Sequence, residues 1–157
     1  MNILTRKFPQ LNLPPAPLRV SECPDGVTRV FDPLRGKLVA LTPEEWVRQH
    51  FVANLITNLG YPPSLLANEV AITLNGTSRR CDTVLYDRQL HPLMIIEYKA
   101  PHIPLTQTTF NQLARYNIVL RTPWLILSNG LVHYCCHIDP ATSAARFLPG
   151  IPRHSDL

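Results

Sequence analysis

The stretch RRCDTVLYDRQLHPLMIIEYKAP, residues 79–101, contains two candidate strands joined by a short polar segment. Residues 81–87 and 93–99 are rich in apolar and β-branched side chains, and the RQLHP between them has turn character. A connection this short predicts an antiparallel hairpin. The apolar run of the second strand nevertheless ends in Glu97-Tyr98-Lys99, and this charged ending needs an explanation.

The expected register of the hairpin sets two carboxylates against each other. Side chains alternate along a strand, so Glu97 and Lys99 share a face. We expect Asp87 to face Pro92, and the same register places Asp82 opposite Glu97. Directly opposed residues point the same way with Cβ atoms ~5 Å apart. Two carboxylates at that separation repel each other, so a positive group should lie between them.

Either Lys99 or a divalent cation could supply this positive charge. Carboxylate oxygens suit Mg²⁺ or Mn²⁺, which keep several waters and accept phosphate oxygens. Such an ion polarises a phosphodiester and lowers the pKa of an attacking water, which Lys99 could orient or deprotonate. The alternative is a surface ion pair among Asp82, Glu97 and Lys99, worth ~0–1 kcal/mol. The apolar run that leads into the charges weighs against this alternative.

The rest of the sequence predicts helices around these strands. Thr42 is a good N-cap, with Pro43 in the first helical position and Glu45 completing a capping box. The helix that begins there should stop at Gly60. A second helix is expected at about residues 106–120. Further strands are expected as two short ones within 29–41, and at 68–74, 123–129 and 131–138. This order predicts a mixed α/β domain built on a central mixed sheet flanked by helices.

The chain divides into three expected segments: a proline-rich N-terminal arm (1–27), a domain (28–140) and a C-terminal tail without pattern (141–157). A length of 157 residues suffices for one domain with a core, and a net charge of +4 permits an anionic partner without demanding one. We see neither the apolar stretch of a secretory signal nor a membrane span. Four cysteines with an adjacent pair make a poor disulfide framework, so we expect the reducing cytoplasm.

The pattern D-x14-E-Y-K, with a helix before and after it, resembles the catalytic motif of the PD-(D/E)XK nuclease superfamily. The likeness is closest to the nuclease domain at the N-terminus of type I restriction enzyme R (motor) subunits, and it covers roughly residues 28–138. The similar blocks are FDPLRGKLVALTPEEWVRQHFVANLITNLGYP, RRCDTVLYD, MIIEYKAP, FNQLARYN and LILSNG. The resemblance implies a restriction-endonuclease-like core, with Asp82 and Glu97 as metal ligands and Lys99 as the catalytic lysine. The nominal proline before Asp82 is Cys81 here, at a position that varies among relatives.

Two residues on the second helix match the Q-x-x-x-Y element of related restriction and recombination nucleases. Gln112 and Tyr116 are four apart and therefore share a helix face. An amide and a phenol at that spacing could hydrogen-bond a phosphate or hold the catalytic lysine. On spacing alone, such a pair is also common on half-exposed helices.

Related nucleases often use an acid on the first helix, and here the candidates are Glu44 and Glu45. The capping box already employs Glu45. Glu44 projects toward the sheet, where a carboxylate is costly to bury unless it is paired. It should therefore either meet Arg48 one turn on or join Asp82 and Glu97 as a metal ligand, and we choose Glu44 for that role.

Three potential zinc ligands share one face of the strand at 131–138: His133, Cys135 and His137. They would be spread over ~13 Å along a flat strand. Metal clusters normally draw their ligands from turns or from several elements, so we expect packing rather than zinc binding.

The function expected from these residues is a Mg²⁺- or Mn²⁺-dependent DNA endonuclease of restriction or repair type. Arg79, Arg80 and Arg115 could grip phosphates, although arginines that serve only solubility are as common. Type I R subunits carry helicase motor domains after the nuclease, and no phosphate-binding GxxxxGK[ST] loop is present here. The resemblance therefore implies either a free-standing relative or one that needs a separate targeting or helicase subunit as partner. A double-strand cut would need a homodimer or two successive nicks. The alternative is a catalytically silent module of the same fold that binds DNA or a partner protein.

Overall fold

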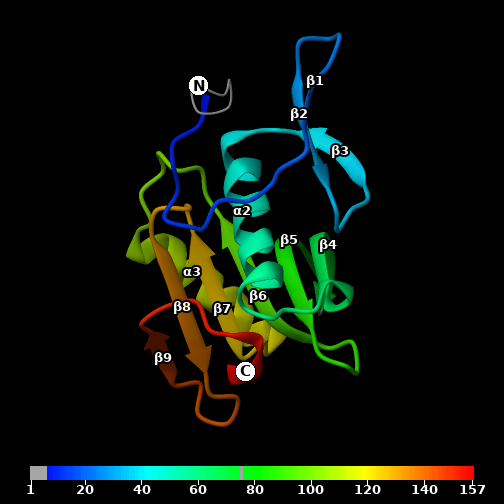
Figure 1. The fold of residues 1–157 in the computed structure, drawn as a ribbon. Coiled ribbons are helices and arrows are strands. Elements are labelled where there is room, and N and C mark those ends of the chain that lie inside the picture. The colour runs from blue at the N-terminus through cyan, green and yellow to red at the C-terminus, as the bar shows by residue number, and fades with distance from the viewer. Residues whose placement is uncertain (1–6, 75) are drawn as a thin grey trace.

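The computed structural model describes residues 7–74 and 76–157, and its centre is a six-stranded sheet (Figure 1). The strand order is β4-β5-β6-β7-β8-β9. Their bounds are β4 Leu66–Leu74, β5 Thr77–Tyr86, β6 Pro92–Tyr98, β7 Trp124–Ser128, β8 His133–Ile138 and β9 Ala145–Leu148. Only β6 and β7 pair in parallel within this sheet, and the other neighbours are antiparallel. The predicted central mixed sheet is therefore confirmed.

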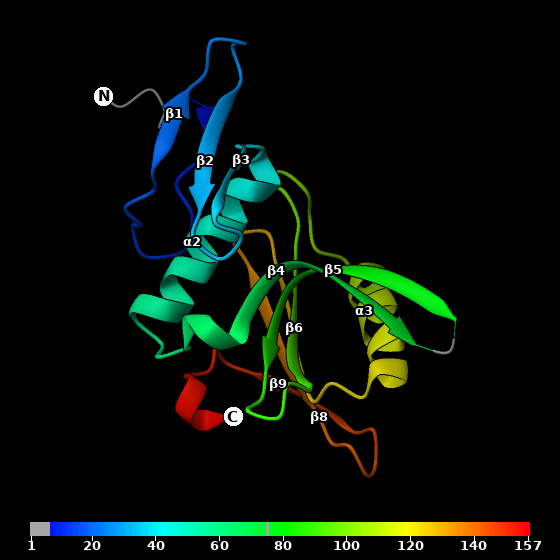
Figure 2. The same cartoon turned by 90° about the vertical axis from the view of Figure 1, so that its right-hand side faces the viewer.

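Two helices, α2 (Pro43–Thr57) and α3 (Gln107–Leu120), cover opposite faces of this sheet (Figure 2). On the α2 side, Phe51 packs edge-on against the ring of Tyr98. On the α3 side, Phe110 and Leu113 join the buried side chains of β5, β6 and β7. The sheet thus separates two cores, and the predicted fold class is confirmed. None of the helices in the described ranges is long and apolar enough to cross a membrane.

The N-terminal cap of α2 is half of the predicted capping box. The Thr42 hydroxyl accepts a hydrogen bond from the backbone N–H of Glu45 (3.1 Å), and Pro43 begins the helix. The backbone N–H of Thr42 donates to the carbonyl of Ala40 instead of to the Glu45 carboxylate. The reciprocal bond is therefore absent, because Glu45 is bonded to Arg35 and Gln49.

A small antiparallel sheet precedes α2 and has the order β1-β2-β3. Its strands are β1 Val20–Glu22, β2 Thr28–Asp32 and β3 Lys37–Ala40. The two short strands expected within 29–41 are confirmed as β2 and β3. β1 lies in the segment expected to be an extended arm, which is also fastened further on: Asn12 N–H donates to the carbonyl of Gly130 (2.8 Å).

The C-terminal segment has more structure than the sequence predicted. β9 pairs with β8, and the short 3₁₀ helix η2 (His154–Asp156) follows. The hydroxyl of the buried Tyr61 donates to the carbonyl of Pro152 (2.9 Å), which ties this segment to the α2 side. The expectation of a patternless tail was wrong because β9 is a mostly exposed edge strand, without the alternation that reveals half-buried strands.

Candidate active site

The β5–β6 hairpin has the register that places two acids together. Thr83 pairs with Ile96, and Val84 pairs with Ile95. One further step in the same register sets Asp82 opposite Glu97, as the sequence predicted. This alignment brings an acid from each strand to the same end of the hairpin.

The outer end of the hairpin differs from the prediction. A bulge at Leu85/Tyr86 shifts the ladder, so Tyr86 faces Pro92 and the expected pairing of Asp87 with Pro92 was wrong. Asp87 instead accepts hydrogen bonds from the backbone N–H groups of the turn, at Gln89 and His91 (both 2.9 Å). The bulge absorbs one residue and leaves the inner register unchanged.

The Asp82–Glu97 pair is largely enclosed, since its side chains are 15 % and 14 % exposed. Burial and then the adjacent charge of Asp82 raise the pKa of Glu97 to about 8. Asp82 Oδ2 accepts a hydrogen bond from the backbone N–H of Tyr98 (2.9 Å), which fixes one of its oxygens. The repulsion expected from the sequence is thus one cause of the raised pKa of Glu97.

Two cations lie beside Glu97 in a hollow of about 240 Å³ against α3. Arg79 Nη2 is 2.9 Å from Glu97 Oε1, in an ion pair that lacks the alignment of a hydrogen bond. Lys99 lines the same hollow, and its backbone N–H donates to Ser128 on β7 (2.8 Å). Gln112 closes the hollow from α3. The structure therefore brings Glu97, Lys99 and Gln112 together around one small space.

The side chain of Tyr116, the other predicted member of the helix motif, lies outside what the structure describes. Its backbone belongs to α3, four residues after Gln112. A shared helix face with Gln112 therefore remains a prediction from spacing.

The two acids of the first helix have different surroundings. Burial and then the charge of Asp82 raise the pKa of Glu44, while Lys99 and Arg48 oppose this shift. Glu44 is thus within electrostatic range of both Asp82 and Lys99. Glu45 is buried against Arg35 and Gln49, and its Oε2 lies 3.5 Å from Arg48 Nε. The choice of Glu44 over Glu45 and the role of Glu44 as a ligand remain predictions.

Arg48 is the site residue whose contacts the sequence indicated least. Its side chain is only 4 % exposed, and Nη1 donates to the backbone carbonyl of Asp82 (3.1 Å). Nη2 lies 3.9 Å from Asp82 Oδ1 and donates to Glu69 Oε1, and the guanidinium is 5.9 Å above the ring of Tyr98. The available signal was a lone arginine one helical turn after Glu44, on a helix with a sheet-facing apolar stripe.

Glu69 supplies the counter-charge from β4 in an uncommon backbone conformation. Its φ of 56° is left-handed, and its neighbours Asn68 and Val70 pair on either side of the position opposite Asp82. Such a φ in a residue other than glycine costs on the order of 1–3 kcal/mol and tends to occur at functional sites. No sequence signal marks this residue.

Alongside the site, a buried chain of hydrogen bonds runs from the sheet to β2. The Tyr98 hydroxyl donates to Thr83 Oγ1 (2.9 Å), and the Thr83 hydroxyl donates to Asn68 Oδ1 (2.7 Å). The Asn68 amide donates to Asp32 Oδ2 (2.9 Å), and Arg35 also binds Asp32. Burial by itself would raise the pKa of Asp32, but the hydrogen bonds from Asn68 and Arg35 hold that pKa below its ordinary value.

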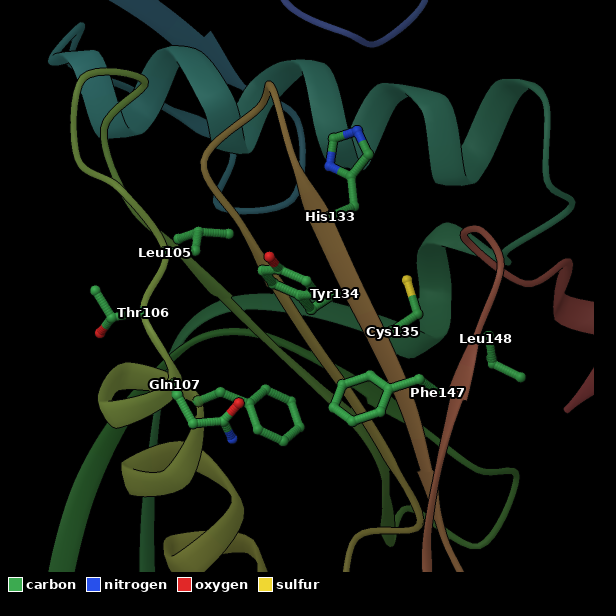
Figure 3. Close-up of a pocket in the computed structure, with 9 residues that line it drawn as sticks. Leu105, Thr106, Gln107, His133, Tyr134, Cys135, Phe147 and Leu148 are labelled. Carbon is green, nitrogen blue, oxygen red and sulfur yellow. The ribbon is translucent and has the colours of Figure 1, made fainter.

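A second hollow, of about 480 Å³, lies between the start of α3 and strands β8 and β9 (Figure 3). Tyr134 and Phe147 lie on one side of β8 and β9, and His133 and Cys135 point to the other (Figure 3). The side chains of Tyr134 and Phe147 are exposed. Among the residues that the structure describes, neither Asp82 nor Glu97 lines this hollow, so it is separate from the acid pair.

The three candidate zinc ligands on β8 serve packing, as expected. His133 packs edge-on against Phe51, and His137 lies over Trp124. Burial raises the pKa of the Cys135 thiol to about 12. Within the described ranges, no group of three or more His, Cys, Asp or Glu residues is arranged to hold a metal ion. Asp82 and Glu97 are therefore a carboxylate pair rather than part of a preassembled cage.

Fold and site together define a class: an α/β domain of nuclease-like architecture, with acids from adjacent strands beside a lysine. The family model described as "Type I restriction enzyme R protein N terminus (HSDR_N)" matches residues 43–152. This match covers more than half of the chain, and the chain belongs to this family. No curated protein matches the chain.

A solved structure shows the same fold. It is a fragment described as an HsdR subunit of a type I restriction enzyme from Vibrio vulnificus YJ016, with a TM-score of 0.52 and 20 % sequence identity. The similarity covers 71 % of this chain and 24 % of that chain. The chain thus corresponds to about a quarter of the longer protein.

Proposed function

We propose that this chain is a Mg²⁺- or Mn²⁺-dependent DNA endonuclease of restriction or repair type, of the PD-(D/E)XK kind. The observation that carries the proposal is the convergence of Glu97, Lys99 and Gln112 around one hollow, with Asp82 beside Glu97. A buried pair of acids is costly unless positive charge compensates it. A divalent cation would offset this cost more fully than one arginine does.

The residues fit such an ion. Mg²⁺ is usually bound through one or two carboxylates, several waters and the phosphates of a substrate, rather than through a cage made wholly of protein. Asp82 and Glu97 would supply two carboxylates, and Glu44, within electrostatic range of Asp82, would be the third. When bound, the ion would polarise the phosphodiester and lower the pKa of the attacking water.

The protein's own groups would position the substrate and manage the proton. Lys99 would orient or deprotonate the water, or neutralise charge that develops on the phosphate. Gln112 would hydrogen-bond the phosphate or hold Lys99, and Tyr116 would share this task from the same helix face. Arg48 would keep the Asp82 strand in place through its bond to the backbone carbonyl.

DNA is the proposed substrate, and a separate targeting or helicase subunit is the proposed partner. One subunit offers one site, so a double-strand cut would require a homodimer or two nicks. We place this activity in the cytoplasm, where the four free cysteines would remain reduced.

The test is cleavage of supercoiled plasmid in the presence of Mg²⁺ or Mn²⁺. Wild type should nick or linearise the plasmid, and Lys99→Ala should lower the rate by about 10²-fold or more, the scale of acid–base catalysis. Lys37→Ala is the matched control, because it removes an exposed lysine from β3 in the small sheet and should leave the rate unchanged. Absence of cleavage by wild type, or equal rates for wild type and Lys99→Ala, would refute the proposal.

A silent nuclease-fold module is the second candidate, and one observation favours it: Arg79 already pairs with Glu97. Such a module would bind DNA or a partner protein without using the acids. DNA binding that is indifferent to Asp82→Asn, Lys99→Ala and divalent cations would support this alternative.

A further inference from the structure

Arg79 contacts an oxygen of Glu97, a carboxylate to which the proposed function assigns a divalent ion. It projects from β5, its side chain is 26 % exposed, and Nη2 lies 2.9 Å from Glu97 Oε1. The contact lacks hydrogen-bond alignment. Arg79 also shares the hollow with Lys99 and Gln112.

Glu97 Oε1 cannot keep this contact and also bind a divalent cation directly. Inner-sphere ligands lie about 2.0–2.1 Å from Mg²⁺, and a guanidinium beside the same oxygen would be repelled by the ion. Arg79 would therefore have to leave Glu97. Its planar fork of donors suits phosphate oxygens, and Lys99 in the same hollow also attracts an anion.

The neighbouring arginine shows that this arrangement is particular to Arg79. Arg80 is 71 % exposed and pairs with Glu69 at 3.2 Å. Adjacent strand residues point to opposite faces, so the side chains of Arg79 and Arg80 lie in different surroundings although they carry the same charge.

Resting on the function proposed above, we propose that Arg79 is a displaceable cation: it holds the divalent-ion position at Glu97 in the free protein, and once displaced it binds a backbone phosphate of the DNA. Arg79 then couples the two ligands. The divalent ion displaces the guanidinium from Glu97, and the guanidinium then adds a phosphate contact that strengthens DNA binding.

The first experiment measures Mn²⁺ binding without DNA, by calorimetry, for wild type, Arg79→Gln, Arg79→Lys and Arg80→Gln. Arg79→Gln removes the competitor and should tighten Mn²⁺ binding about fivefold or more, because coupling between sites is typically 5–150-fold. Arg79→Lys keeps a cation and should bind Mn²⁺ nearly as wild type does. Arg80→Gln should leave the affinity unchanged. Equal Mn²⁺ affinity in wild type and Arg79→Gln would overturn the inference.

The second experiment measures DNA affinity against salt, with Ca²⁺ as a non-cleaving ion or with a chelator. In Ca²⁺, Arg79→Gln should reduce the salt slope by about one, the loss of one phosphate contact. In chelator, Arg79→Gln should have the same salt slope as wild type, because Arg79 is then engaged with Glu97. An equal reduction of the salt slope in Ca²⁺ and in chelator would overturn the inference. Mn²⁺ binding by wild type that requires Asp82 but ignores Arg79 would leave the proposed nuclease standing, whereas no Mn²⁺ binding by wild type would remove both.

Discussion

Asp32 and Glu97 are two enclosed carboxylates in one small domain, and their surroundings give them opposite properties. Asp32 accepts hydrogen bonds from Asn68, Arg35 and backbone N–H groups, and its pKa lies below the ordinary value in spite of burial. Glu97 has a second acid beside it and one misaligned arginine, and its pKa rises to about 8. Burial alone therefore does not set the pKa of an enclosed acid; the hydrogen-bond donors and charges around it decide the direction of the shift.

The largest expected effect concerns Asp32, the acid that accepts several hydrogen bonds. Asp32→Asn should lower the free energy of unfolding by about 3 kcal/mol, the lower end for breaking a buried pair, because Arg35 retains Glu45. Urea unfolding at pH 7 measures this loss. Glu97→Gln is the isosteric control, and it should cause no comparable loss. Equal destabilisation by the two substitutions would erase the distinction between the two acids.

A second difference should be visible in the pH dependence of stability. The pKa of Glu97 rises from an ordinary 4.5 to about 8 on folding, so between these values the folded protein holds a proton that the unfolded chain has released. The free energy of unfolding should fall as pH rises through this window, by up to about 1.4 kcal/mol per pH unit. Asp32 has the opposite sign: its contribution is lost as pH falls below its ordinary value of 3.8.

The control for this pH effect is again Glu97→Gln. Glu97→Gln should lose this fall between pH 5 and pH 8, whereas Asp32→Asn should keep it. The pH dependence that remains in Glu97→Gln should come from Glu44, whose pKa burial raises, and from His50 and His133, whose pKa values burial lowers. A fall that survives undiminished in Glu97→Gln would assign the effect to another group.

The smallest expected effect concerns the hydrogen-bond chain that leads from Tyr98 to Asp32. Tyr98→Phe removes one donor to Thr83 and should cost about 1 kcal/mol, the usual net value of one hydrogen bond. It should leave divalent-ion affinity unchanged, because the backbone N–H of residue 98, which binds Asp82, is retained. A large loss of divalent-ion affinity in Tyr98→Phe would show that Asp32 and Glu97 are not independent.

The sequence predicted the acid pair because alternation and a short hairpin fix which side chains face each other. It also indicated Glu44, since a half-buried acid on a helix that faces the sheet needs a reason. The contacts of Arg48 with Asp82 and Glu69 were beyond such reasoning, because these partners come from separate strands, β5 and β4. The bulge at Leu85/Tyr86 and the exposed strand β9 were missed for a related reason: neither leaves a periodic pattern.

The resemblance to R subunits gained a firmer basis from the family match and from the fold. The match begins at residue 43, so the small sheet of β1, β2 and β3 lies before it. That sheet supplies Asp32 and Arg35, which anchor Asn68 and Glu45 near the site. The small sheet therefore supports the acids indirectly, through the first helix and β4.

Calorimetric titration with Mn²⁺ tests most directly whether the Asp82–Glu97 pair is built for a cation. Wild type should bind one ion and release close to one proton per ion at pH 7, seen as a binding heat that depends on the buffer, because Glu97 must give up its proton. Asp82→Asn should abolish binding, whereas Asp32→Asn, assayed where it is still folded, should retain it. Absence of Mn²⁺ binding by wild type, or binding that survives Asp82→Asn, would contradict this account.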